Sequence, residues 1–186
     1  HPLVPLTDYN KYKGLSEPLL LKHQSPEFTT VIIRPATVCG YSPRMRFDLT
    51  VNEFTKDLLT NGTLAVYGEQ HWRPYVHVAD AARAIARVLS MPEEKVSGRV
   101  YNVGDTSQNL QKGQLVNLIR DRLDIETEVE KVHKEEDPRD YRVSFDKIRD
   151  ELDFEITRTV ADGIEEIIEA ISLGVFEDLD APRYRN

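Results

Sequence analysis

The sequence has little cysteine, no long apolar run and no glycine-rich loop near its start, and each lack excludes a class of protein. Cys39 is the single cysteine in 186 residues, which excludes an internal disulfide framework and a cysteine-based zinc cluster. No apolar run approaches the roughly 18 residues of a membrane span. The first five residues lack the basic and apolar regions of a signal peptide. We therefore expect a cytoplasmic protein that is not bound to a membrane.

Basic residues are outnumbered, since 24 Lys and Arg face 32 Asp and Glu and the formal net charge is −8. A surface with this acidic excess repels the phosphates of nucleic acids and of anionic lipids, so neither partner is expected. A hydrophobic content of 40% with 30% charged residues is typical of a folded globular chain. The histidines lack the H-x-x-x-H spacing of metal ligands, and we expect no metal site.

Predicted strands alternate with predicted helices. β-branched or alternating runs predict strands at 29–33, 64–67, 75–78, 99–103 and 126–132, and apolar residues at helical spacing predict helices at 11–22, 49–59, 81–89, 114–123, 145–152 and 160–173. Pro18 fits the first helix only as a kink or a break. Asp80 is a candidate N-cap and Asn61-Gly62 a candidate C-cap. This alternation predicts an α/β or α+β fold.

The start of the chain lacks the G-x-G-x-x-G motif that usually marks a dinucleotide-binding loop after an early strand. The sequence opens on a proline-containing stretch and passes almost at once into a predicted helix. A chain of 186 residues has the length of one domain or one and a half. We interpret its first residues as the middle of a domain.

A tyrosine and a lysine four residues apart, Tyr9 and Lys13, open the first predicted helix. This spacing puts both side chains on one helix face. A phenol titrates at about pH 10 and is a poor base at neutral pH, but a neighbouring ammonium favours the phenolate. Such a pair can move a proton to or from a sugar hydroxyl or a ketone during hydride transfer. Taken alone, the spacing is more typical of a solvated helix start than of a catalytic pair.

Five segments, in one order along the chain, resemble the motifs of a known family. They are Pro5 to Glu17, like P-x-x-x-Y-x-x-x-K-x-x-x-E; residues 33–40, like R-x-x-x-V-Y-G; residues 66–82, like V-Y-G-D-G-x-Q-x-R-D-Y-V-H-V-x-D-V-A; residues 100–104, like Y-N-V-G; and the late segment 141–164, like L-G-…-G-I. Cys39 and Pro74 replace a more usual Tyr and Asp. The sequence resembles the extended short-chain dehydrogenases/reductases, the NAD-dependent epimerase/dehydratase family.

The resemblance implies an α/β chain: the C-terminal part of a Rossmann-type extended short-chain dehydrogenase with its smaller α/β substrate-binding domain. Residues 1–40 would be the last helix and strand of the NAD-binding Rossmann domain. Residues 41–175 would be mainly the substrate-binding region, with segments that return to the Rossmann sheet, and residues 176–186 a polar tail. The glycine-rich half and the family's catalytic Ser or Thr would precede residue 1, and Thr7 does not match that position.

Carried over position by position, the resemblance makes Tyr9 the catalytic acid/base. Lys13 would hold the nicotinamide ribose and tune Tyr9. A short backbone segment would lie beside the nicotinamide carboxamide: Pro35, Ala36, Thr37 and Val38. Thr37 stands where many members have Asn, which leaves a substrate contact there open. The implied cofactor is NAD, with NADP as the alternative.

The implied substrate is a nucleotide-sugar. Asn52 would contact its diphosphate, against the alternative of an exposed helical amide. Arg73 would grip the diphosphate, because a guanidinium meets phosphate oxygens bidentately, against the alternative of a weak surface ion pair. Arg139 or Arg142 would make a second phosphate or ribose contact, and the spacing does not choose between them.

The implied activity is that of an NAD-dependent nucleotide-sugar epimerase or dehydratase. A homodimer packed through the helix of Tyr9 and Lys13 is implied as well. Two alternatives remain open: a reductase of the same family that acts on a small non-nucleotide ketone, and a catalytically inert fragment or binding module. Without the glycine-rich loop and a third catalytic residue, we expect the chain by itself to be inactive.

Overall fold

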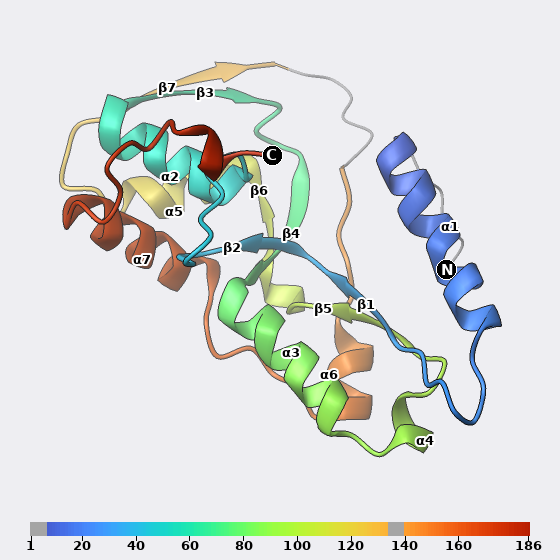
Figure 1. Cartoon of the computed structure of the whole chain (residues 1–186). Helices are drawn as coiled ribbons and strands as arrows, with labels where there is room; N and C mark the ends of the chain where they lie inside the picture. The colour runs from blue at the N-terminus through green and yellow to red at the C-terminus, as the bar shows by residue number, and fades with distance from the viewer. Residues whose placement is uncertain (1–6, 134–139) are drawn as a thin grey trace.

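Three small sheets form the centre of the computed structural model, which describes residues 7–133 and 140–186 (Figure 1). The parallel pairs are β1 (Ile32–Pro35) with β5 (Val100–Val103), β2 (Thr37–Cys39) with β4 (Trp72–His77), and β3 (Thr63–Tyr67) with β7 (Glu128–Val132), and β4 also pairs antiparallel with β6 (Asn109–Gln111). Parallel strands joined through helices are typical of α/β folds, so the predicted class is confirmed.

Seven helices and two short 3₁₀ turns accompany these strands in the described residues. They are α1 (Asp8–Lys22), α2 (Thr50–Asn61), α3 (Val78–Ser90), α4 (Glu93–Val96), η1 (Thr106–Gln108), α5 (Lys112–Arg120), α6 (Asp146–Leu152), α7 (Val160–Ser172) and η2 (Pro182–Tyr184). In Figure 1 the β3–β7 ribbon lies above α2, α5 and α7, while α3 and α6 lie near β1 and β5. The sequence pattern predicted the longer helices to within a few residues, and Gly62 ends α2 with φ 68° as the expected C-cap.

Two clusters of buried apolar side chains pack the helices against the strands, one around β1 and β5 and one under the β3–β7 ribbon. Around β1 and β5, α3 contributes Ala84 and Val88, and α6 contributes Ile148 and Leu152, each pair four residues apart on one helix face. Under the β3–β7 ribbon, α2, α5 and α7 pack against one another and against β4 through a second set of side chains, which includes Val51, Leu58, Tyr75, Leu115, Ile119 and Ile164. The helical spacing of these residues is the reason that the pattern predicted their helices.

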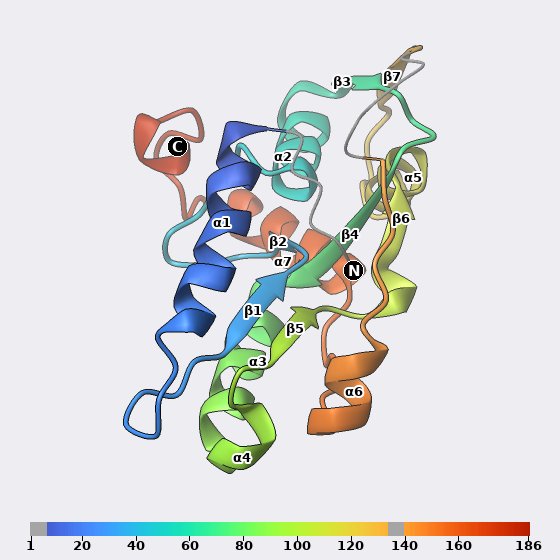
Figure 2. The ribbon, with the colours of Figure 1, turned by 90° about the vertical axis from the view of Figure 1, so that its right-hand side faces the viewer.

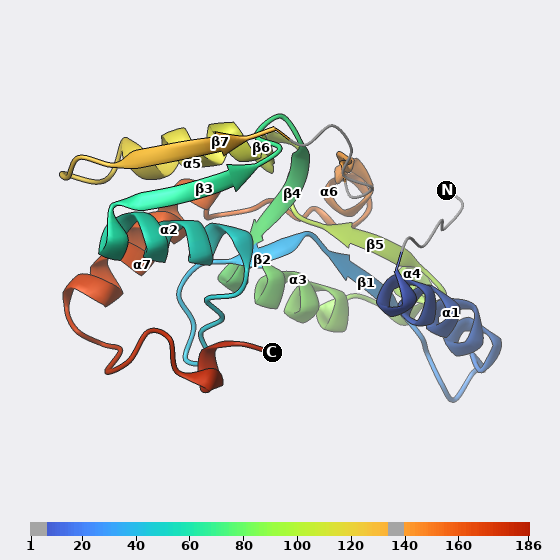
Figure 3. The same cartoon turned by 90° about the horizontal axis from the view of Figure 1, so that it is seen from above.

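Helix α1 stands at the edge of the molecule, beside β1 in Figure 2 and at the far end in the view from above (Figure 3). Thr7 caps it by accepting a hydrogen bond from the Asn10 N–H at 3.2 Å. The helix runs through Pro18 without a break, and none of its residues is buried. Its orientation therefore depends on polar contacts rather than on an apolar face.

Short strands account for the largest differences between prediction and structure. β1 begins at Ile32, three residues later than predicted, and β2 lies outside the predicted strands. β4 begins at Trp72, because residues 72–74 pair with β6 before residues 75–77 pair with β2. Strands of three residues are too short to show an alternating pattern, so β2 and β6 left no signal in the sequence.

The last residues are polar in composition, but they do not form a free tail. Tyr184 is buried against Phe47 and Phe176, with ring centroids 5.6 and 5.5 Å away. The Phe47 N–H donates to the Tyr184 carbonyl at 2.9 Å. The expectation of a polar tail at 176–186 is corrected, because two isolated aromatic residues fix the segment against the loop before α2.

The sequence suggested Asp80 as the N-cap of α3, and this prediction is wrong. The cap is His77, whose Nδ1 accepts a hydrogen bond from the Ala79 N–H at 3.1 Å. Asp80 is fully buried in the first turn instead, and it accepts hydrogen bonds from the Thr157 N–H, the Thr157 hydroxyl, the Arg158 N–H at 2.8 Å and Arg83. This carboxylate joins α3 to the segment that leads into α7.

We predict that Asp80→Asn lowers the free energy of unfolding by about 2–4 kcal/mol, because an amide cannot accept all of these hydrogen bonds and brings donors of its own. Burial alone would raise the pKa of Asp80, but the N–H groups of Arg158 and Thr157 and the Arg83 guanidinium outweigh it and lower the pKa. The stabilisation is therefore complete above the unfolded pKa of about 4, and is lost as pH falls through the lower folded pKa.

Urea unfolding at neutral and acidic pH measures both effects. Asp150→Asn is the control, because Asp150 is exposed beside Arg149 and its loss should cost under about 0.5 kcal/mol. Equal losses in the two variants would contradict the structural role of Asp80.

Candidate functional site

Tyr9 and Lys13 lie on the same face of α1, as the spacing predicted. The Lys13 Nζ is 5.9 Å from the centroid of the Tyr9 ring. The Tyr9 side chain is 70% exposed, so a substrate or cofactor could reach the phenol. This is a contact of the ammonium with the ring, and a catalytic role for the pair stays a prediction.

Glu17, one turn after Lys13, forms a bidentate ion pair with Arg34 on β1. The Arg34 Nε donates to Glu17 Oε1 at 2.7 Å, and Nη2 donates to Oε2. The hydrogen bond from Glu17 is the largest cause of the raised pKa of Arg34. The motif matches included both residues, but nothing in the sequence indicated that they pair across 17 positions.

The segment Pro35–Val38, predicted to lie beside nicotinamide, follows directly from Arg34 at the carboxyl end of β1. Pro35 is exposed, Ala36 is buried, and the Ala36 N–H donates to the Val103 carbonyl at 2.9 Å. Ligands in open α/β sheets bind at the carboxyl ends of parallel strands, and β1 and β5 are parallel. The Glu17–Arg34 ion pair thus joins the helix of Tyr9 and Lys13 to the strand that ends in this segment.

Asn52 is buried in α2 and is not the exposed helical amide that was the alternative to its substrate role. Its Oδ1 accepts a hydrogen bond from the Gly40 N–H at 3.2 Å, and its Nδ2 donates to the Arg46 carbonyl at 2.9 Å. Through these two hydrogen bonds the Asn52 side chain fixes the loop between β2 and α2. A contact between Asn52 and a diphosphate stays a prediction.

Arg73 is 8% exposed on β4, which does not fit the alternative of a surface ion pair. Its Nη1 donates to the Trp72 carbonyl at 2.7 Å. The Arg142 guanidinium stacks over the Trp72 ring at 5.0 Å. The Trp72 N–H donates to Asp140 at 2.7 Å and is the largest cause of the lowered pKa of that carboxyl. The structure thus brings Arg142 to the residue beside Arg73, whereas Arg139 lies outside the described residues.

His77 is a structural histidine. It is 2% exposed, its Nδ1 caps α3, and its Nε2 lies 2.9 Å from Glu166 Oε2. Because Nδ1 accepts a hydrogen bond, Nε2 carries the proton and donates to Glu166. Two glycines pack on the ring: a Cβ on Gly40 would come within 2.4 Å of Nε2, and one on Gly163 within 3.1 Å of Cδ2.

The single thiol lies next to this histidine contact, at the end of β2. Cys39 is 1% exposed, and burial raises its pKa to about 12. A thiol that stays protonated is a poor nucleophile. Cys39 therefore acts as a small apolar residue of the core.

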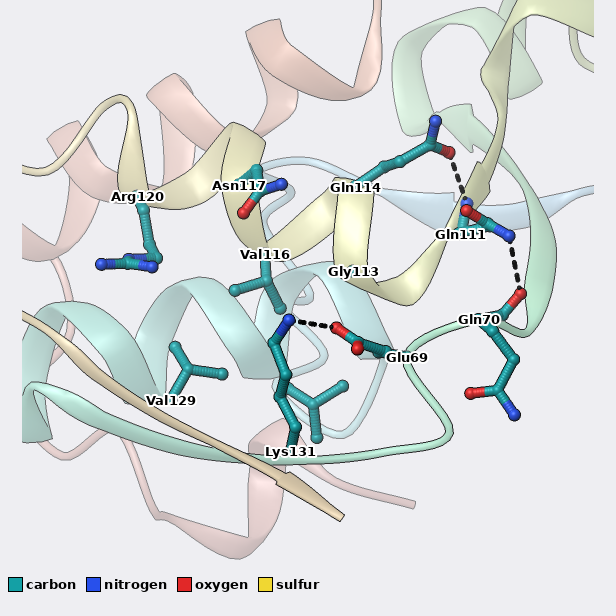
Figure 4. Close-up of a pocket in the computed structure, with 11 residues that line it drawn as sticks. Glu69, Gln70, Gln111, Gly113, Gln114, Val116, Asn117, Arg120, Val129 and Lys131 are labelled. Atoms are coloured by element: carbon teal, nitrogen blue, oxygen red, sulfur yellow. Dashed lines mark hydrogen bonds and ion pairs between the residues drawn. The ribbon is translucent and has the colours of Figure 1, made fainter. Parts of the chain in front are cut away.

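Two hollows lie on either side of the β3–β7 ribbon. One of about 360 Å³ faces α5, and an ion pair of 2.8 Å joins Lys131 to Glu69 at its edge (Figure 4). The other, of about 650 Å³, runs from the first turn of α2 along β3, where the Tyr67 ring is exposed. Neither hollow is lined by Tyr9 or Arg73. The first hollow is lined by Gln111, which pairs with Trp72, and the second by residues of α2, the helix that carries Asn52.

In the ranges 7–133 and 140–186, no three His, Cys, Asp or Glu side chains are grouped so that they could hold a metal ion. Within the same ranges we find no helix with the length and apolar content of a membrane span.

Comparison with known proteins adds to this geometry. A model of the NAD dependent epimerase/dehydratase family matches residues 1–104. The chain is 28% identical over 171 residues to a dTDP-glucose 4,6-dehydratase of Streptomyces niveus, covering 90% of this chain and 49% of that protein. The chain thus spans about half the length of this relative.

Solved structures agree with the fold. A dTDP-glucose 4,6-dehydratase from Streptomyces venezuelae with NAD bound is 27% identical, with a TM-score of 0.77 over 95% of this chain and 55% of that one. A UDP-glucuronic acid 4-epimerase from Bacillus cereus in complex with UDP-glucuronic acid and NAD is 21% identical, with a TM-score of 0.77 over 91% and 54%. Each likeness covers about half of a longer chain, which agrees with the predicted C-terminal part of a Rossmann-type protein.

We predict that Gly40→Ala lowers the free energy of unfolding by about 2–4 kcal/mol, because its Cβ would overlap the His77 ring in a left-handed backbone conformation. Gly174→Ala is the matched control: Gly174 also has a positive φ, of 69°, but nothing lies within 4 Å of its Cβ. That variant should cost about 1 kcal/mol.

Thermal or urea unfolding measures the difference, and Gly40→Ala should cost less in a His77→Ala background than in the wild-type chain, because the overlapping ring is gone. A Gly40→Ala variant that is no less stable than Gly174→Ala would contradict the close packing.

Proposed function

The chain belongs to the NAD dependent epimerase/dehydratase family, and from this premise we propose that the protein acts on a nucleotide-sugar with bound NAD, as an epimerase or dehydratase. The observation that carries the proposal is the Lys13 ammonium 5.9 Å from the exposed Tyr9 ring. NADP is the alternative cofactor. We also propose that the protein is cytoplasmic.

Tyr9 is the proposed acid/base. In its deprotonated form Tyr9 takes the proton of a sugar hydroxyl and returns it later in the reaction. Lys13 has donors for the nicotinamide ribose, and the backbone of Pro35–Val38 provides polar groups at the carboxyl end of β1, so these residues fit the cofactor. The cofactor, when bound, supplies the hydride acceptor and donor.

The diphosphate is the proposed anchor of the substrate. The Arg73 guanidinium contacts the Trp72 carbonyl and the Arg142 guanidinium lies over the Trp72 ring, and a guanidinium binds phosphate oxygens in pairs. Asn52 and Arg139 remain proposed contacts. The hollow along α2 and β3 offers an exposed Tyr67 ring on which a nucleobase could stack. Binding energy from these remote groups orients the reacting sugar carbon.

Two alternatives carry different consequences. A reductase of the same family for a small ketone would need no diphosphate anchor, and the burial of Arg73 does not favour it. A catalytically inert module is what we propose for the isolated 186-residue chain, since it lacks a glycine-rich cofactor loop.

We propose a homodimer that packs through α1, whose Leu15 and Leu19 are exposed.

We predict that Arg73→Lys weakens the binding of thymidine or uridine diphosphate about 10- to 100-fold, because an ammonium cannot form the paired hydrogen bonds of a guanidinium. Arg149→Lys is the control, because Arg149 is an exposed arginine on α6 paired with Asp146 and Asp150. Isothermal titration of the 186-residue chain with each diphosphate gives the affinities, and circular dichroism checks the fold. Equal affinities in the two variants would exclude Arg73 as the anchor.

For catalysis, Tyr9→Phe should lower kcat by at least about 100-fold, because no phenol remains to move the proton. The variant is made in a polypeptide that joins this chain to a glycine-rich NAD-binding half. Mass spectrometry and NMR of the sugar product detect loss of water or inversion of a centre. Tyr12→Phe is the control on the same helix, and diphosphate affinity should stay unchanged in both variants. Full activity of Tyr9→Phe would overturn the mechanism.

A further inference from the structure

Glu17 occupies a position on α1 from which it would normally pair with Lys13. The two residues are four apart, and side chains at this spacing are neighbours on a helix surface. Oppositely charged side chains so placed attract each other. If the Glu17 carboxylate paired with Lys13, its negative charge would offset the positive charge that the ammonium places beside the proposed acid/base, Tyr9. The sequence alone therefore sets two partners, Tyr9 and Glu17, in competition for one ammonium.

Arg34 removes Glu17 from this competition. Its guanidinium holds both carboxylate oxygens, with 2.7 Å between Nε and Oε1. The Glu17 side chain is only 16% exposed in this pair, and that of Arg34 33% exposed. A bidentate, half-buried pair is stronger than a single contact between exposed charges on a helix surface. The Lys13 Nζ lies 5.9 Å from the centroid of the Tyr9 ring, and in the described part of the chain no ion pair joins Lys13 to a carboxylate.

The charged groups around this arrangement are few. Helix α1 carries Asp8 and Lys11 near Tyr9, in addition to Lys13 and Glu17. Within the described part of the chain, Arg34 is the charged side chain from outside α1 that forms an ion pair with it. The balance between Tyr9, Lys13 and Glu17 thus depends on one residue of β1.

We propose that Arg34 is a positioning residue that holds Glu17 away from Lys13 and so keeps the ammonium available to the Tyr9 phenol. The inference deepens the proposed function, since it concerns the residue proposed as acid/base. Arg34 touches neither substrate nor phenol in this role. It acts by binding the Glu17 carboxylate, which then does not pair with Lys13.

The test follows the titration of the Tyr9 phenol by NMR in the 186-residue chain with isotope-labelled tyrosine, with Tyr9→Phe to assign the signal. In Arg34→Ala the freed Glu17 moves to Lys13, and the titration midpoint of Tyr9 should rise, by at most about 0.3 pH units. In the double variant Glu17→Ala/Arg34→Ala no carboxylate remains to compete. Its midpoint should return to the wild-type value, and Tyr12 on the same helix serves as the internal reference.

This pattern separates the inference from a purely structural role. If the ion pair only fixes α1 in place, Glu17→Ala, Arg34→Ala and the double variant should all change the Tyr9 titration alike, and the inference is overturned. An unchanged midpoint in Arg34→Ala also overturns it. Circular dichroism of each variant verifies that α1 and the fold are retained. The titration needs no turnover, so failure of the proposed function shows separately, in the Tyr9→Phe assay.

Discussion

The contact of the His77 imidazole with Gly40 and Gly163 is the constraint on which the candidate site depends. At this point β4 ends, α3 begins under the His77 cap, and α7 passes with Glu166 hydrogen-bonded to the ring. The loop that leaves β2 can come this close only because Gly40 has no Cβ. Asn52 then fixes the same loop through the Gly40 N–H. These contacts, together with the apolar cluster under α2, hold that helix beside β2 and β4.

The sequence predicted the fold where burial recurs with a regular period. The longer helices were found because their buried residues repeat every three or four positions, as Ile164 and Ile167 do in α7. The strands β2 and β6, of three residues each, carry no period and were missed. The packing of the last residues was missed for a related reason: one buried aromatic residue, Tyr184, fixes a segment that is polar in composition.

From the sequence, the candidate site could be predicted only for residues that stand at motif positions, and not for the partners that they contact in the fold. Tyr9 and Lys13 are close in the sequence, so their shared helix face followed from their spacing. Long-range pairing leaves no such local trace: nothing near Glu17 indicates Arg34, and nothing near Asp80 indicates Thr157. A short polar side chain such as Asp80 can cap its own helix or another segment, and tertiary packing decides which.

Helix α1 carries the proposed acid/base and yet buries none of its residues, which has a physical consequence. A helix of 15 residues is marginally stable alone, and one bidentate ion pair adds little beyond about 1 kcal/mol where it is partly exposed. Gln24, just after the helix, adds hydrogen bonds to Thr30 and Ser97, which hold only its C-terminal end. Proton transfer needs a geometry held more tightly than these contacts provide. Covering the exposed Leu15 and Leu19 in the proposed homodimer would bury apolar area and fix the rotation of the helix, so the interface and the acid/base would depend on one another.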